Sequence, residues 1–261
     1  GLYRDPSGND LETEALYGEL VTVQAFKPGW AQVVTQLDAY PGYIKLACLK
    51  EGKGERPTHR VAELSAAVYS QPDFKKPVVS TLFLNSLVRV AAEMQTPEGV
   101  MCEIPGLGWV FERRLKPIEH TAPDFVDECF RLGNKDIGVE YGWGQRSNRF
   151  DCSAAIQAAC IAAGIPCPRD CLPQSQALGE QVSYAPDFSD LRRGDLVFWT
   201  EKKGRHVAVM VGNDECFNVT VAEPWGRALV QPLLEVIDAQ ERDGNGRPTL
   251  VRRFAGYHSL P

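Results

Sequence analysis

The sequence is organised around residues 141–164, YGWGQRSNRFDCSAAIQAACIAAG, in which a loop rich in glycine and aromatic residues leads into an alanine-rich run. Apolar residues recur from Ser153 onward at helical spacing, and Gly164 stands where a left-handed C-terminal cap belongs. This pattern predicts a helix whose first turn holds Cys152. There, unpaired backbone N–H groups and the helix dipole lower the pKa of a thiol. Cys152 is therefore either a nucleophile or a small packed residue.

Length, composition and charge limit the number of domains and the class of protein. The chain has 261 residues, of which 44% are apolar and 24% charged, and its net charge is −6. This length predicts two or three compact units of ordinary globular composition. An acidic balance argues against nucleic acid or an anionic membrane as the main partner, and no run approaches the length of a membrane span. The sequence carries no signal for the oligomeric state.

Cysteine usage points to a compartment. Several of the eight cysteines lie inside apolar runs, which favours reduced thiols over a disulfide scaffold. The N-terminus lacks a signal-peptide pattern, so we expect the cytoplasm, or the periplasm or secretion if a signal peptide has been removed before Gly1. Cys160, Cys167 and Cys171 have no CxxC pair and no histidine among them. We therefore expect no metal and no cofactor.

The first 116 residues contain a repeat. Its two copies are offset by 66 residues, matching Tyr3 with Tyr69, Gly42 with Gly108, and Leu49 with Leu115. Each copy alternates short β-type segments with turns, which predicts two small β-barrels at residues 1–52 and 60–117. A charged, glycine-containing linker is expected over residues 50–60, His59 included. Unrelated β-rich segments are the alternative.

The two copies resemble bacterial SH3-like domains. In the first copy the resemblance rests on Gly29-Trp30 and on the turn YPGY at residues 40–43. In the second it rests on Gly99-Val100 and on GLGW at residues 106–109.

The remainder, residues 121–261, has a different pattern. An apolar helical stripe follows Asp124 and ends at Gly133. After the helix that begins at Cys152 comes a polar, proline-rich connection. Strands are then predicted over residues 195–200, 206–211, 215–220, 227–231 and 250–254, with a hairpin signal at 212–214 and a short helix over 233–242. Helices followed by an antiparallel meander make an α+β domain.

A cysteine nucleophile needs a base and a third group that fixes the imidazole. Of the four histidines, His59 and His120 fall in predicted linkers and His258 lies three residues from the end. His206 alone begins a predicted apolar strand, so it is the expected base. The alternative is a half-exposed histidine at a strand end.

The hairpin geometry selects the third residue. Position 206 pairs opposite roughly 218 to 220, and alternation leaves Asn218 and Thr220 on the face of His206. An asparagine oxygen can accept a hydrogen bond from an imidazole N–H. Asn218 is therefore the predicted third residue, with a polar side chain on a solvated strand face as the alternative.

Four motifs in order carry a family resemblance: YGWG at 141–144, RFDCS at 149–153, LRRGDLVFW at 191–199 and HVAVMVG at 206–212. Over about residues 120–256 the chain resembles the NlpC family of papain-like cell-wall cysteine peptidases. The resemblance implies a papain-like fold with Cys152 as nucleophile, His206 as base and position 218 as third residue. The family usually has histidine at this position. Because asparagine carries no charge, the resemblance does not predict how the activity of this protein depends on pH.

The resemblance also implies substrate-binding residues. Tyr141 lines the cleft, although its spacing to Cys152 is one residue shorter than expected for the family. Asp151 and Ser153 hold the substrate's terminal amine, which suits carboxylate and hydroxyl acceptors. Asp151 fits a helix N-cap equally well, and the backbone N–H of Cys152 is the expected oxyanion donor.

Relatives with two SH3-like domains cut murein peptides between γ-D-glutamate and an L-diamino acid and prefer a free N-terminal L-alanine. We therefore expect a cysteine peptidase of this kind, an endopeptidase or dipeptidyl-peptidase for short murein-derived peptides, whose barrels wall the cleft. One alternative is a murein-peptide-binding protein whose peptidase domain has lost activity, which Asn218 motivates. Another is an acyltransferase or amidase on the same fold.

Overall fold

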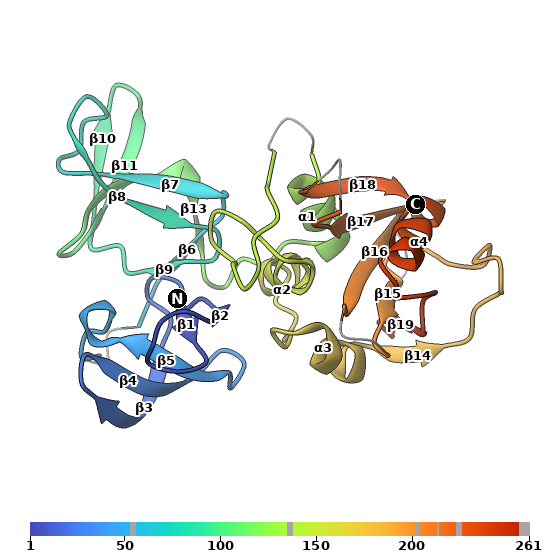
Figure 1. Cartoon of the computed structure of the whole chain (residues 1–261). Helices are drawn as coiled ribbons and strands as arrows, with labels where there is room; N and C mark the ends of the chain where they lie inside the picture. The colour runs from blue at the N-terminus through green and yellow to red at the C-terminus, as the bar shows by residue number, and fades with distance from the viewer. Residues whose placement is uncertain (53–55, 135–137, 202–203, 213, 223–225, 256–261) are drawn as a thin grey trace. The chain divides into compact units, whose positions relative to one another are not determined.

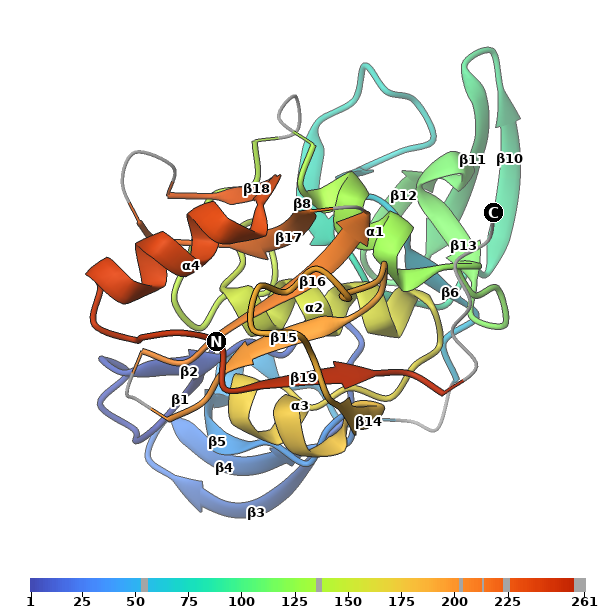
Figure 2. The same cartoon turned by 90° about the vertical axis from the view of Figure 1, so that its right-hand side faces the viewer.

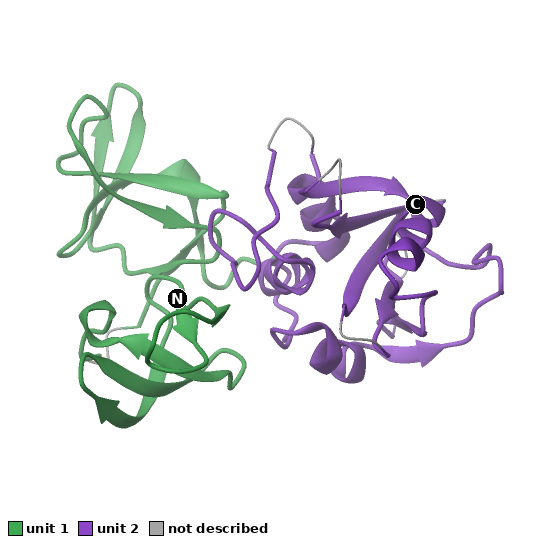
Figure 3. Cartoon of the chain, viewed as in Figure 1, with its two compact units in different colours: residues 1–121 green, residues 122–261 purple. Residues whose placement is uncertain are grey.

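The structure, a computed structural model, describes residues 1–52, 56–134, 138–201, 204–212, 214–222 and 226–255. The chain forms two compact units, residues 1–121 and residues 122–261 (Figure 3). No helix among the described residues is long and apolar enough to cross a membrane. The finer division of the first unit at residues 52 and 60 stays a prediction.

The first unit begins with a five-stranded antiparallel sheet in the order β2-β1-β5-β4-β3 (Figure 1). Its elements are β1 (Leu2–Tyr3), β2 (Leu11–Thr13), β3 (Val21–Lys27), β4 (Trp30–Thr35), β5 (Pro41–Lys45) and the 3-10 turn η1 (Leu46–Cys48). Every second residue of β4 is buried, as expected for a strand with one face on a core. That core contains Leu2, Ala31, Val33 and Ile44.

Two further sheets complete this unit, β10-β11-β12-β7-β8 and β13-β6-β9. Their elements are β6 (His59–Val61), β7 (Ser65–Tyr69), β8 (Val78–Phe83), β9 (Leu87–Val88), β10 (Ala92–Thr96), β11 (Gly99–Ile104), β12 (Gly108–Phe111), η2 (Glu112–Arg114) and β13 (Leu115–Pro117). They enclose a separate core around Val61, Val68 and Val110.

The placement of His59 in a linker is wrong. His59 and Arg60 belong to β6 and pair with Val88 and Leu87. Two polar residues give no alternation signal, so only the backbone ladder reveals that they form a strand. Of the predicted linker, residues 53–55 lie outside the described residues.

The predicted repeat is present in the strand pairing. Tyr3 pairs with Tyr43 in the first copy, and Tyr69 pairs with Trp109 in the second, at the same offset. In each copy a 3-10 turn directly follows the paired strand. Gly108 has a φ of 143°, and a Cβ there would lie 2.4 Å from the carbonyl oxygen of Tyr69. This close backbone approach requires glycine.

The second unit holds a six-stranded antiparallel sheet in the order β14-β19-β15-β16-β17-β18. Its elements are α1 (Phe125–Leu132), α2 (Cys152–Ala162), α3 (Cys171–Ala177), β14 (Glu180–Val182), β15 (Leu196–Trp199), β16 (His206–Gly212), β17 (Glu215–Val219), β18 (Ala228–Pro232), α4 (Leu233–Arg242) and β19 (Leu250–Arg253). The five strands predicted after residue 190 and the helix at 233–242 are confirmed to within one residue. The hairpin signal at 212–214 includes residue 213, which lies outside the described residues, as does His258.

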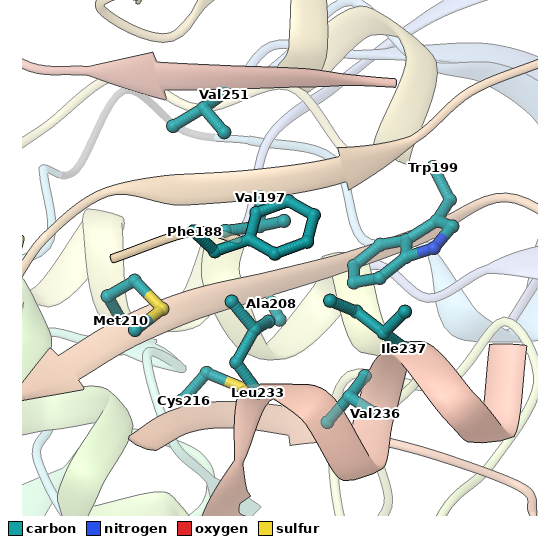
Figure 4. Close-up of a cluster of buried hydrophobic side chains, with 10 residues drawn as sticks. All are labelled: Phe188, Val197, Trp199, Ala208, Met210, Cys216, Leu233, Val236, Ile237 and Val251. Carbon is teal, nitrogen blue, oxygen red and sulfur yellow. The ribbon is translucent and has the colours of Figure 1, made fainter. Parts of the chain in front are cut away.

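Helices cover both faces of this sheet. In Figures 1 and 2, α1 and α2 lie on one side of the central strands and α4 lies on the other. Figure 4 shows Leu233, Val236 and Ile237 of α4 packed over Ala208 and Met210 of β16. Because side chains alternate along a strand, His206 shares the face of Ala208, at the end of β16.

Candidate active site

Cys152 is the first residue of α2. The side chain of the preceding Asp151 caps the helix by accepting from the backbone N–H of Ala154 at 2.8 Å. At the other end Gly164 has a φ of 72°, which confirms the predicted left-handed cap. Nearly all of the side chains between them are buried, so α2 is a central core helix. A rigid element therefore positions the thiol.

The loop before α2 folds back onto the helix start. Tyr141 and Phe150 form an isolated parallel bridge, and the N–H of Gly142 donates to the carbonyl of Phe150 at 3.0 Å. The N–H of Gly144 donates to the carboxylate of Asp151 at 3.1 Å. These bonds hold the Tyr141 side of the loop beside the start of α2.

The pKa of the Cys152 thiol lies below its ordinary value. The largest cause is a hydrogen bond from the thiol of Cys171, whose sulfur is 3.5 Å from that of Cys152. A hydrogen bond from the His206 imidazole and the charge of that ring lower the pKa further, while burial and the charge of Asp151 act in the opposite direction. The helix N-terminus also favours the anion. The His206 imidazole thus lies where it can stabilise the Cys152 anion, and the roles of the two residues as base and nucleophile stay predictions.

His206 is buried at the start of β16 and packs against an indole. Its ring centroid lies 5.4 Å from that of Trp199, at an interplanar angle of 57°. Trp199 is the cross-strand partner of His206, and its Nε1 donates to the carbonyl of Gly246 at 2.9 Å. The indole therefore limits where the imidazole can turn. Trp199 is not among the residues predicted for the site, although its strand directly precedes that of His206, and this order favours a pairing of the two strands.

Asn218 is buried but makes no hydrogen bond to His206 in this structure. Among the described residues, neither its Oδ1 nor its Nδ2 has a hydrogen-bond partner, and the Nε2 of His206 also has none. The ladder between β16 and β17 has its last pair at Val209 and Phe217. Carried further, that register would place Asn218 opposite Ala208, diagonal to His206 on the same face. Its role as the third residue stays a prediction.

Asp151 and Ser153 are occupied by protein contacts. The guanidinium of Arg169 donates to both carboxylate oxygens of Asp151, at 2.9 and 2.6 Å, and its side chain is only 1% exposed. The hydroxyl of Ser153 donates to Asp151 at 3.1 Å and accepts from Arg169 at 3.1 Å. The N-cap alternative for Asp151 is the one observed, and amine binding by this pair stays a prediction. Arg169 lies in the proline-rich connection and carried no sequence signal.

Tyr141 lies close to the same group. The pKa of its phenol is raised by burial and then by the charges of Cys152, Asp151 and Cys171. The phenol therefore keeps its proton and can donate a hydrogen bond near Cys152. Its contact with a substrate stays a prediction.

The thiols of the connection do not form a metal centre in the part of the chain that the structure describes, where no group of three or more metal-binding side chains occurs. Cys160 and Cys167 are buried. Cys171 instead lies against Cys152, a contact that no sequence pattern predicts.

A cysteine at the N-terminus of a core helix, next to a histidine at the end of a strand in an antiparallel sheet, is the arrangement of a papain-like cysteine peptidase. Comparison with known proteins agrees. Residues 138–224 match the NlpC/P60 family, and residues 2–49 match the bacterial dipeptidyl-peptidase Sh3 domain. The protein is therefore a peptidase that acts on cell-wall peptides. Its NlpC/P60 domain follows an SH3-like, β-rich region in the sequence.

Individual relatives span most of the chain. The γ-D-glutamyl-L-lysine dipeptidyl-peptidase of Bacillus cereus is 27% identical over 239 residues, covering 83% of this chain and 69% of that protein. Its namesake from Bacillus subtilis is 27% identical over 219 residues, covering 78% and 70%. The crystal structure of an NlpC/P60 family protein from Bacillus cereus superimposes with a TM-score of 0.72 at 25% identity, covering 95% of this chain and 83% of that one.

Proposed function

We propose that the protein hydrolyses short murein-derived peptides at the bond between γ-D-glutamate and an L-diamino acid. The observation that carries the proposal is the position of Cys152 at the start of α2, within an NlpC/P60 domain, and the lowered pKa of this thiol, to which His206 contributes, supports it. The names of the two Bacillus relatives support the choice of bond.

Hydrolysis proceeds in two steps. The Cys152 thiolate attacks the γ-carbonyl carbon, and the oxyanion forms near the backbone N–H groups that open α2, which have no intrahelical partners. His206 gives its proton to the leaving amine as the C–N bond breaks, which leaves a thioester. A water that loses its proton to His206 then attacks the thioester, and the C–S bond breaks to release the acid.

A free N-terminal L-alanine belongs to the proposal through the family resemblance. Asp151 already accepts from Arg169, from Ser153 and from two backbone N–H groups. Little acceptor capacity remains on that carboxylate for a substrate ammonium. We therefore expect Asp151 to act on the substrate chiefly by fixing Ser153 and the start of α2.

The test compares the parent protein, Cys152→Ala and Cys48→Ser with two substrates, L-Ala-γ-D-Glu-L-Lys and L-Ala-γ-D-Glu-meso-diaminopimelate. Cys48 is an exposed thiol in the first unit, so its variant is the matched control. The parent and Cys48→Ser should release L-Ala-γ-D-Glu, detected by mass spectrometry, while Cys152→Ala should release none. Failure of the parent on both tripeptides would reject the proposed bond, and equal cleavage by Cys152→Ala would reject the nucleophile.

A murein-peptide-binding protein without activity is the second candidate. The buried, unpaired amide of Asn218 favours it, because an imidazole without an orienting partner is a weaker base. In that case Cys152 should react with iodoacetamide no faster than the other cysteines. Selective alkylation of Cys152, measured by peptide mapping, would reject this candidate.

We further propose a cytoplasmic setting. None of the eight cysteines, all of which are among the described residues, forms a disulfide, which fits a reducing compartment. Fractionation of the source cells with an antibody to the protein should find it in the cytosolic fraction, and recovery only from outside the inner membrane would contradict the proposal.

A further inference from the structure

The nearest sulfur to the nucleophile belongs to a second cysteine. The sulfurs of Cys152 and Cys171 are 3.5 Å apart, and each cysteine is the first residue of a helix, α2 or α3. A disulfide has an S–S length of about 2.05 Å. Closure therefore brings the two sulfur atoms closer by roughly 1.5 Å.

The two thiols differ in access and in protonation. Cys152 is partly exposed, whereas Cys171 is buried. The hydrogen bond to Cys152, together with burial, raises the pKa of Cys171, so its sulfur keeps its proton. No step of the proposed hydrolysis uses the Cys171 sulfur. An accessible thiolate beside a second thiol is the arrangement found in cysteines that sense oxidants.

We propose that Cys152 and Cys171 form a reversible disulfide in the presence of a peroxide, and that this bond switches the enzyme off. Cys152 is the sulfur that the oxidant meets first, and Cys171 is the resolving thiol. The inference adds a modification site to the proposed peptidase and does not depend on its substrate.

The chemistry balances in two steps. The Cys152 thiolate attacks one oxygen of hydrogen peroxide, so that an S–O bond forms, the O–O bond breaks and hydroxide leaves. The Cys171 sulfur then attacks the sulfenic sulfur while its proton passes to the departing hydroxide. An S–S bond forms, the S–O bond breaks and water leaves. Two thiols are oxidised and one peroxide is reduced to two waters, and an external dithiol reverses the bond by exchange.

Three buried thiols compete poorly for the oxidant. Burial raises the pKa of Cys102 to about 11 and also raises the pKa of Cys129 and Cys216. Each is therefore a protonated, inaccessible sulfur at neutral pH. The sulfenic acid should form at Cys152, and Cys171 lies where it can capture that acid before further oxidation.

The experiment treats the full-length protein with a small excess of hydrogen peroxide and follows three quantities. These are cleavage of the tripeptide, the iodoacetamide reactivity of Cys152, and the mass of the peptides that contain residues 152 and 171. We expect all cleavage and all Cys152 alkylation to be lost, with the two peptides joined and lighter by two hydrogen atoms. Dithiothreitol should restore both readouts nearly completely.

The variant Cys171→Ser, compared with its own untreated activity, should lose Cys152 reactivity irreversibly and gain two or three oxygen atoms on that residue. Cys48→Ser is the matched control and should behave like the parent. Parent protein that gains oxygen on Cys152 without a 152–171 link would overturn the proposal. Full recovery of Cys171→Ser by dithiothreitol would overturn it as well. Because alkylation and mass need no substrate, the test stands even if neither tripeptide is cleaved.

Discussion

At the scale of single residues, the reactivity of Cys152 depends on groups that stabilise its anion. A free thiol has a pKa of about 8.5, and the neighbouring Cys171 thiol and His206 imidazole lower that of Cys152. The thiolate is present above the folded-state pKa and is lost as the pH falls through it. Iodoacetamide should therefore alkylate Cys152 rapidly below pH 7, where the other cysteines react slowly.

The variant His206→Ala removes one hydrogen bond and one positive charge from the thiolate. Its alkylation profile should move to higher pH by about one unit or more, since one unit corresponds to about 1.4 kcal/mol of lost stabilisation. His59→Ala, which changes a histidine in the first unit, is the control. Superimposable rate–pH curves for His206→Ala and the parent would show that the imidazole does not stabilise the thiolate.

A substitution at Asn218 can separate the effect of this residue on stability from its effect on catalysis. Because its amide is buried without a hydrogen-bond partner, replacement by the similarly sized Asn218→Leu should leave the free energy of unfolding unchanged or raise it by about 1 kcal/mol. If the amide orients His206 during turnover, kcat should nevertheless fall by about 10- to 100-fold. Denaturant titration and steady-state kinetics measure the two effects. A loss of more than about 1 kcal/mol in stability with unchanged kcat would contradict both expectations.

A site residue can be predicted from the sequence when the pattern that indicates it lies in the residues around it. Cys152 and His206 could be predicted because each lies within a local motif, a loop followed by a helix for Cys152 and an apolar strand for His206. Cys171 and Arg169 come from a proline-rich connection with no periodicity, and only folding brings them to Cys152 and Asp151. Their contacts are tertiary, so no local pattern could have indicated them.

At the scale of elements, the start of α2 is held by a buried ion pair. The Arg169 side chain is buried and binds both carboxylate oxygens of Asp151, and Asp151 in turn caps α2. Replacing one partner leaves an uncompensated buried charge, so Arg169→Met should lower the free energy of unfolding by about 3–5 kcal/mol. Chemical denaturation measures the change.

Arg4→Met supplies the matched control for this ion pair. The Arg4 side chain is 67% exposed and pairs with Asp10 and Glu12 at the surface. Such surface pairs contribute about 0–1 kcal/mol. Equal destabilisation by the two variants would contradict the assignment of Arg169 as the residue that anchors α2.

Elements with a clear apolar pattern are predictable from the sequence, whereas α3 and β14 are not. The helix α4 has apolar residues on one face and was placed at Leu233–Arg242, the same bounds that the structure gives. By contrast, α3 spans seven residues with a proline inside it, and β14 spans three. Too few residues form either element for an apolar period to appear, and their positions depend on packing against α2 and β19.

At the scale of the whole molecule, the catalytic chemistry is confined to one unit. Cys152, His206, Asn218 and Tyr141 all lie within residues 122–261, while the repeated β-sheets lie within residues 1–121. The first unit supplies none of the proposed catalytic groups. We therefore expect it to influence which substrates are processed rather than how the bond is broken.

The two functions should separate on truncation. We expect residues 122–261 alone to keep a Cys152 that alkylates below pH 7, because α2, β16 and the Arg169–Asp151 pair all belong to that unit. The full chain should cleave the tripeptide in preference to intact murein, and the truncated protein should lose most of that preference. Rates on both substrates, each normalised to alkylatable Cys152, measure the change. An unchanged ratio with a fully reactive Cys152 would mean that residues 1–121 do not set the choice between short peptides and polymer.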